Sequence, residues 1–212
     1  MAIIQSGADS TLLTVDPTMR AARVVMKPDE MTGSYQLATV SGGTTGIAAG
    51  GTLFSFRYSP GTSAVAIVKR VSIGFVTTAF TTAGQHSFGL YAARNFTGSD
   101  SGGTGTTLSG NNNKYRTSFS TTGVADLRIS TTAALTVGSR TVDTNPLGLI
   151  NFYESAVGTS LTQTELMNYD ISDYPLVLVN NEGFVINNVT VYPVSNVGTL
   201  IVNVEWFETS AY

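Results

Sequence analysis

The feature that most constrains this chain is an alternation between two kinds of sequence from residue 37 onward. Short runs of β-branched and aromatic residues are separated by clusters of Gly, Ser, Thr and Asn, a pattern typical of strands and turns. In residues 52–58, for example, Phe54, Phe56 and Tyr58 share one face of a half-buried strand. Eight or more such runs predict an all-β fold, a jelly-roll-like antiparallel β-sandwich with an extended N-terminal arm.

Three segments depart from this simple pattern. Residues 64–76 form a run longer than a usual strand, and Lys69 and Arg70 interrupt it, which predicts a bend or a bulge. Residues 161–167 favour a short helix, because the segment begins with the residue spacing of a capping box. Residues 97–113 are polar throughout and have no apolar face to bury, so we expect a surface loop there.

Residues 1–36 differ in sequence pattern from residues 37–212. Their short extended runs stop near Pro17 and Pro28, because proline has no amide proton to donate. We expect residues 1–36 to form an extended arm that lies on another surface, and residues 37–212 to form the sandwich domain. The alternative is an ordinary edge strand of the same domain. The arm residues expected to contact a partner are Leu12, Leu13, Val15, Arg20, Arg23 and Val25.

The composition excludes several classes of chemistry. The chain has no Cys and one His, which excludes disulfides, thiol catalysis, iron–sulfur clusters, Cys-ligated zinc and His-pair metal sites. A net charge of −3 argues against a general nucleic-acid binder. No run reaches the roughly 18 apolar residues of a membrane span. The first residues lack the pattern of a signal peptide, so we expect synthesis in a host cytoplasm. We expect no cofactor, no resident metal, no nucleic acid and no membrane partner.

No group of residues has the pattern of a catalytic site. His86 is the only imidazole, and no nucleophile elbow accompanies it, so we expect it to be a polar turn residue. Glu205 and Glu208 face opposite sides of one strand, which does not suit the paired carboxylates of a glycosidase. Asp170 and Asp173 share a loop compatible with a calcium ion, but the full EF-hand ligand series is missing. The sequence therefore predicts a protein that is not an enzyme and has no catalytic residues.

Charge is divided unevenly along the chain. Residues 1–140 contain all eleven Lys and Arg side chains with six acidic ones, and residues 141–212 contain eight acidic side chains and no basic one. Three arrangements neutralise this asymmetry: the two parts interleave in one sandwich, copies of the chain pair basic to acidic surfaces, or a partner supplies the missing charge.

Four strand aromatics are expected to lie in the core or at an interface between copies. Trp206 shares its strand face with Val202 and Val204, so burial is the expectation for its large ring. The four aromatics are Phe54, Phe56, Trp206 and Phe207.

Several passages resemble a group of uncharacterised structural proteins from tailed-phage genomes and viral metagenomes. The resemblance lies in residues 13–25, 93–105, 125–131, 181–187 and 202–208. It implies a phage structural protein with a jelly-roll-like domain, similar to head decoration and cement proteins. Such proteins are commonly β-rich, form trimers and bind major capsid subunits.

We therefore expect a non-enzymatic virion protein that binds and stabilises the major capsid shell as a homo-oligomer, most simply a trimer. One alternative is a receptor- or glycan-binding module of a head fibre or tail appendage. A jelly-roll capsid protein is a further alternative, although residues 1–30 have a net charge of −1 and do not suit genome packaging.

Overall fold

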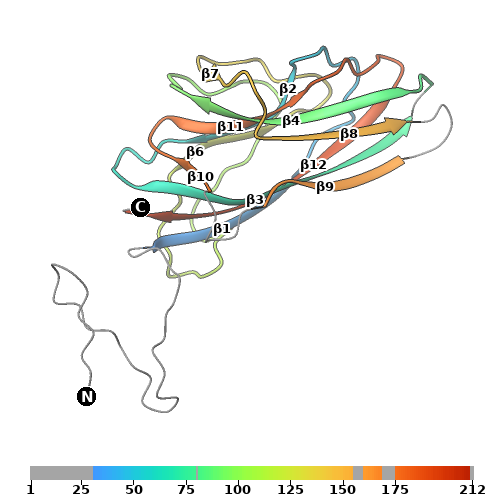
Figure 1. The fold of residues 1–212 in the computed structure, drawn as a ribbon. Coiled ribbons are helices and arrows are strands. Elements are labelled where there is room, and N and C mark those ends of the chain that lie inside the picture. The colour runs from blue at the N-terminus through green and yellow to red at the C-terminus, as the bar shows by residue number, and fades with distance from the viewer. Residues whose placement is uncertain (1–30, 80, 155–159, 169–174, 211–212) are drawn as a thin grey trace, which may run out of the picture.

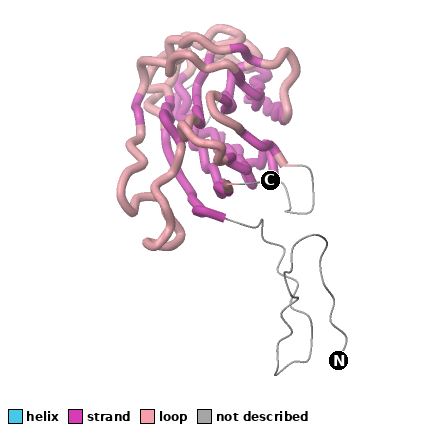
Figure 2. Tube along the Cα trace, turned by 90° about the vertical axis from the view of Figure 1, so that its left-hand side faces the viewer, coloured by secondary structure: helices cyan, strands magenta, loops and turns pink. Residues whose placement is uncertain are grey.

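The computed structural model describes residues 31–79, 81–154, 160–168 and 175–210, which form strands and no helix (Figures 1 and 2). The strands are β1 (Met31–Val40), β2 (Thr52–Tyr58), β3 (Val65–Ala79), β4 (Gly84–Arg94), β5 (Thr104–Gly105), β6 (Val124–Ile129), β7 (Thr141–Val142), β8 (Gly148–Glu154), β9 (Ser160–Asn168), β10 (Leu176–Leu178), β11 (Glu182–Asn188) and β12 (Val197–Thr209).

The strands form two antiparallel sheets packed face to face. Sheet I has the order β1-β12-β3, and both β9 and β10 pair with the far edge of β3. Sheet II has the order β5-β6-β2-β11-β4, and both β7 and β8 pair with the far edge of β4. Without the inserted β5–β7 and β10, the two sheets read β1-β12-β3-β9 and β2-β11-β4-β8. This is the strand order of a jelly roll, and it confirms the predicted all-β sandwich.

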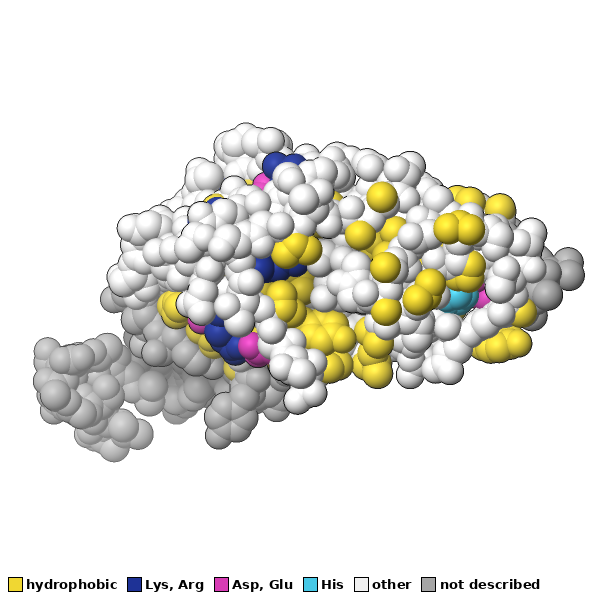
Figure 3. All heavy atoms as spheres, turned by 90° about the horizontal axis from the view of Figure 1, so that it is seen from above, with side chains coloured by type: hydrophobic (Ala, Val, Ile, Leu, Met, Phe, Trp, Pro, Cys, Tyr) yellow, Lys and Arg dark blue, Asp and Glu magenta, His cyan; other side chains and the backbone are white. Residues whose placement is uncertain are grey.

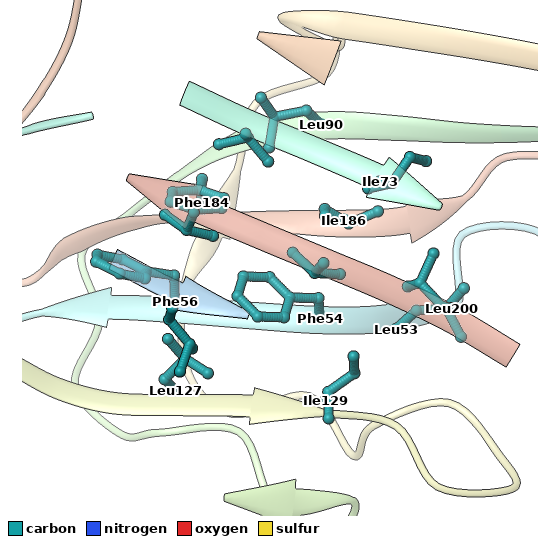
Figure 4. Packing of buried hydrophobic residues seen from close by; sticks show 14 of the residues in the cluster. Leu53, Phe54, Phe56, Ile73, Leu90, Leu127, Ile129, Phe184, Ile186 and Leu200 are labelled. Atoms are coloured by element: carbon teal, nitrogen blue, oxygen red, sulfur yellow. The ribbon is translucent and has the colours of Figure 1, made fainter. Parts of the chain in front are cut away.

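The core lies between the two sheets, and aromatic rings gather at both ends of it. Trp206 stacks on Tyr35 with 5.4 Å between ring centroids and meets Phe56 edge-on at 5.3 Å. Phe54, Phe56 and Trp206 are at most 1% exposed. Phe207 lies on the opposite face of β12 and is 8% exposed. The core residues labelled in Figure 4 are Leu53, Phe54, Phe56, Ile73, Leu90, Leu127, Ile129, Phe184, Ile186 and Leu200.

The domain begins at β1, nearer the N-terminus than the boundary at residue 36 that the sequence predicts. Residues 31–36, which the sequence assigned to the arm, pair with β12, and Tyr35 is fully buried. The alternation of Tyr35 and Leu37 toward the core drives this pairing, and the small residues before Tyr35 conceal it in the sequence. Residues 1–30, with all six arm residues named above, lie outside the described residues.

The helix predicted over residues 161–167 is wrong, because this segment belongs to β9. Its backbone pairs with β3 from Arg70 to Thr77. A ladder with a strand distant in sequence outweighs the local capping-box pattern, which by itself stabilises a helix only weakly.

Two bulges set which side chains enter the core. Lys69 has no partner on β12, because Arg70 pairs with Glu205 and Val68 pairs with Trp206, so the predicted irregularity is confirmed. Leu53 is likewise unpaired in the ladder between β2 and β11, and it enters the core beside Phe54. The prediction of a half-buried β2 is therefore wrong, since side chains on both of its faces are buried.

Candidate functional site

His86 lies in β4, and its side chain is only 2% exposed. The prediction of a polar turn residue is therefore wrong, because His86 alternates with Phe88 and Leu90 toward the interior. Its ring packs against Tyr192 at 4.9 Å and against Phe152 at 5.6 Å between centroids. The only imidazole of the chain thus belongs to the packed end of the sandwich where β4 begins.

Glu154, at the end of β8, is the acidic partner of this imidazole. Its Oε2 lies 3.3 Å from Nε2 of His86, without the alignment of a hydrogen bond, and its side chain is fully buried. The Thr77 hydroxyl donates to Oε1, and the Asn196 amide donates to Oε2 over 3.3 Å. Burial lowers the pKa of His86 and raises the pKa of Glu154, so both shifts favour neutral groups.

Asn196 extends this cluster to the turn between β3 and β4. Its Oδ1 accepts the backbone N–H groups of Thr81 and Thr82 at 3.0 and 3.1 Å. The cluster therefore joins β3, β4, β8 and the segment before β12 at one end of the sandwich. Its two titratable side chains, His86 and Glu154, are at most 2% exposed.

Glu208 occupies the opposite end and is 4% exposed. Its carboxyl accepts the Gly123 N–H at 2.9 Å, the indole N–H of Trp206 at 3.2 Å and the Thr122 hydroxyl. Burial raises the pKa of Glu208, although these donors partly offset the shift. Glu205 faces the other side of β12 and lies 3.6 Å from Arg70, so the prediction that the two glutamates face opposite sides is confirmed.

A second buried pair, Asp100 with Arg140, holds two loops against the outer face of sheet II. Both side chains are at most 1% exposed. Asp100 also accepts the Gly138 N–H at 2.7 Å, and Arg140 donates to the Thr52 hydroxyl at 3.0 Å. Burial lowers the pKa of Arg140 to about 10, which leaves it charged at neutral pH. The polar segment 97–113 is therefore largely a surface loop, as expected, but it is anchored by one buried carboxylate.

Ion pairs between the two parts of the chain neutralise part of its charge asymmetry. Arg94 pairs with Asp143 and lies 3.8 Å from Glu182. Arg70 pairs with Glu205 across β3 and β12. These contacts agree with the interleaved arrangement, while Arg128 and Arg140 pair with Asp126 and Asp100 within the first part. Pairing between copies and charge from a partner stay predictions.

The buried polar pairs are the residues that sequence reasoning missed. His86, Glu154 and Glu208 could have been suspected individually, because each is in phase with apolar residues of its strand. Asp100 and Arg140 lie in loops that offer no such signal. Asp170 and Asp173, considered for calcium, lie outside the described residues. Elsewhere in the described ranges, no group of three or more acidic or histidine side chains could hold a metal ion. No described helix could cross a membrane.

The fold and these clusters define an antiparallel jelly-roll sandwich that buries one Asp–Arg ion pair, one Glu–His contact and one hydrogen-bonded glutamate. No family model matches the chain, and no curated protein or solved structure matches it either.

Proposed function

We propose that this chain is a non-enzymatic structural protein of a phage virion, a decoration or cement protein that binds the major capsid shell and stabilises it. The observation that carries this proposal is the burial of four titratable side chains that could otherwise serve catalysis. The side chains of His86, Glu154 and Asp100 are at most 2% exposed, and Glu208 is nearly as deeply buried. A sandwich of this kind acts through its surface. The resemblance to tailed-phage structural proteins directs the proposal to a capsid.

The outer surface of the sandwich is suited to many weak contacts with another protein. The outer face of sheet II is mostly uncharged and carries scattered apolar side chains (Figure 3). Single apolar side chains on a surface are ordinary, but many weak contacts repeated over one shell gain by avidity. The exposed large apolar residues are Val40, Tyr115, Val137, Leu147, Leu149, Tyr153, Val179, Val191 and Val194.

The arm provides the second part of the proposed mechanism. Residues 11–15 and 20–26 have the pattern of short extended segments, and an extended segment can add a strand to a neighbour through backbone hydrogen bonds. The domain begins at β1, so removal of residues 1–30 leaves every described strand intact. We propose that these residues bind the capsid protein and that the chain assembles as a trimer on the shell.

Cosedimentation with empty capsid shells of the phage that encodes the chain tests this proposal. We expect deletion of residues 1–30 to abolish binding while the circular dichroism spectrum and unfolding midpoint stay those of a folded sandwich. A deletion of residues 1–10, which spares the predicted contact residues, is the matched control and should still bind. Full binding by the longer deletion would refute the role of the arm, and no binding by the intact chain would refute the capsid proposal.

One observation favours the alternative of a receptor- or glycan-binding module. Tyr115 is 55% exposed, and its hydroxyl donates to Oε1 of Gln36 at 2.7 Å in a hollow that Asn113 also lines. An exposed aromatic ring beside amide side chains is a common surface for a sugar. Binding of the intact chain to host cells, without binding to capsid shells, would support this alternative.

A further inference from the structure

Two edges of the sandwich are covered by segments of the chain itself. Along β1, backbone bonds join Gln36 to Asn113, Tyr115 to Ser34 and Ser120 to Thr32. Along β6, the short strand β5 pairs with residues 128 and 129, and Thr106 donates to the Leu127 carbonyl. Proteins protect sheet edges in this way because unpaired backbone groups otherwise recruit another strand.

Strand β8 is a sheet II edge without such cover among the described residues. It pairs with β4 alone, over Gly148–Glu154, in a register without a bulge (Figure 1). Backbone groups of alternate residues in an antiparallel strand point to opposite sides. Since β4 uses the Leu90 carbonyl toward Leu147 and the Ser87 carbonyl toward β11, the outward groups of β8 are those of Leu149, Asn151 and Tyr153.

The side chains of β8 also lack the usual protection of an edge. Leu149 and Tyr153 are 52% and 69% exposed on the outer face of the strand. No Lys, Arg or Pro occurs in Gly148–Glu154, and its only charged residue, Glu154, is buried. An edge without a bulge, without an exposed charge and with exposed apolar side chains is the kind of edge that pairs with another chain.

The inner face of β8 is incomplete as part of a core. Ile150 and Phe152 point toward the core cluster but are only partly buried, because the sandwich ends at this strand. A strand added at this edge would cover both side chains and extend the core beyond one copy of the chain.

We propose that β8 pairs antiparallel with β8 of a second copy about a two-fold axis through Asn151. This register places Leu149 opposite Tyr153 of the second copy and Ile150 opposite its Phe152. Apolar side chains then meet apolar ones on both faces, no like charges meet, and the two Asn151 amides can bond to each other. Sheet II becomes continuous across both copies.

The self-complementary pattern is what identifies the occupant as a second copy. Two apolar residues flank Asn151 on each side. Ile150 and then Leu149 precede it, and Phe152 and then Tyr153 follow it. An isologous contact requires such a match, whereas a foreign strand does not. The proposal does not rest on binding to a capsid. In an assembly that also has three-fold contacts, the β8 contact would join two trimers.

The native mass of the full chain tests this contact. We expect an even-numbered assembly, a dimer or a pair of trimers, in light scattering across a dilution series. The double variant Leu149→Lys/Tyr153→Lys should halve this mass, because charges on both copies would face each other along the paired edge. The matched control Val191→Lys/Val194→Lys changes two exposed residues outside the strand and should keep the mass. A monomeric or three-fold wild type, or an unchanged mass in the β8 variant, would overturn the proposal.

Amide hydrogen exchange of the unmodified chain gives a second test that does not depend on how the variants fold. The amides of Leu149, Asn151 and Tyr153 should be protected at high protein concentration and exchange quickly after dilution. The amides of Ile150 and Phe152, which face β4, should stay protected at both concentrations. Fast exchange of the first three amides at every concentration would contradict edge pairing.

Discussion

The two ends of the sandwich each bury a glutamate, but with different neighbours. Glu208 accepts hydrogen bonds from Gly123 and Trp206, so donors hold its carboxyl in place. Glu154 faces the unaligned imidazole of His86, and burial lowers the pKa of His86 and raises the pKa of Glu154, so that the neutral form of each group is favoured. The donors at the first end are neutral groups that do not titrate near neutral pH, whereas the second end adds a second titratable group, the imidazole of His86.

Replacement of Trp206, at the Glu208 end, should cause the largest loss in the free energy of unfolding. Trp206→Ala removes the stack on Tyr35, the edge contact with Phe56 and the bond to Glu208. We expect a loss of about 3–5 kcal/mol in the free energy of unfolding, measured by urea denaturation. Trp206→Phe retains a ring and loses the indole donor, so it should cost less. Equal losses for the two variants would show that the hydrogen bond, and not packing, dominates this end.

Paired substitutions of the two glutamates should have the next largest effect. Glu208→Gln can keep an acceptor at the position of Oε1, which receives the Trp206 and Gly123 donors, but it then places an amide nitrogen at the position of Oε2, 2.9 Å from the Gly123 nitrogen, so that two donors face each other. We expect a loss of about 1–3 kcal/mol. Glu154→Gln should cost less than about 1 kcal/mol, because the neutral imidazole of His86 can accept the new amide proton. Urea denaturation at pH 8 measures the loss in unfolding free energy for both variants. Equal losses would contradict the proposed difference between the two ends.

Much of the fold could be predicted from the sequence, because strand alternation is a local pattern. The inward face of β12, with Val202, Val204 and Trp206, is visible in its period of two. The segment of β9 was misassigned, because its partner β3 is distant in sequence and local spacing resembled a helix start. Local pattern therefore predicts which residues face inward better than it predicts which strands pair.

The buried clusters could be predicted only in part. Asp100 and Arg140 come from two loops that meet over sheet II, and nothing near either residue in the sequence indicates the other. The same holds for His86 and Glu154, which the ladder between β4 and β8 brings together. Such pairs depend on register between strands, which composition and periodicity do not determine.

The smallest expected effect is the pH dependence of the unfolding free energy that comes from His86. Because burial lowers the pKa of His86 in the folded state, the unfolded chain binds more protons as the pH falls below 6.5. Stability from this group is therefore present above 6.5 and lost as the pH falls toward the lowered pKa, by at most about 1.4 kcal/mol per pH unit. The raised pKa values of Glu154 and Glu208 act in the opposite direction, since their contribution is lost as the pH rises above 4.5.

The variant His86→Phe separates these contributions. It keeps a ring beside Tyr192 and Phe152 and removes the titrating group, while Glu208 stays in place. The difference in unfolding free energy between wild type and variant should be constant above pH 7 and should shift against the wild type below pH 6.5. The matched control is the same comparison in a Glu208→Gln background, which lacks the titrating group of the other end: the difference between Glu208→Gln and Glu208→Gln/His86→Phe should show the same decline below pH 6.5. A constant difference between wild type and His86→Phe across this range would show that Glu154 stabilises the protonated imidazole as strongly as burial opposes it, and the two ends would then respond to pH alike.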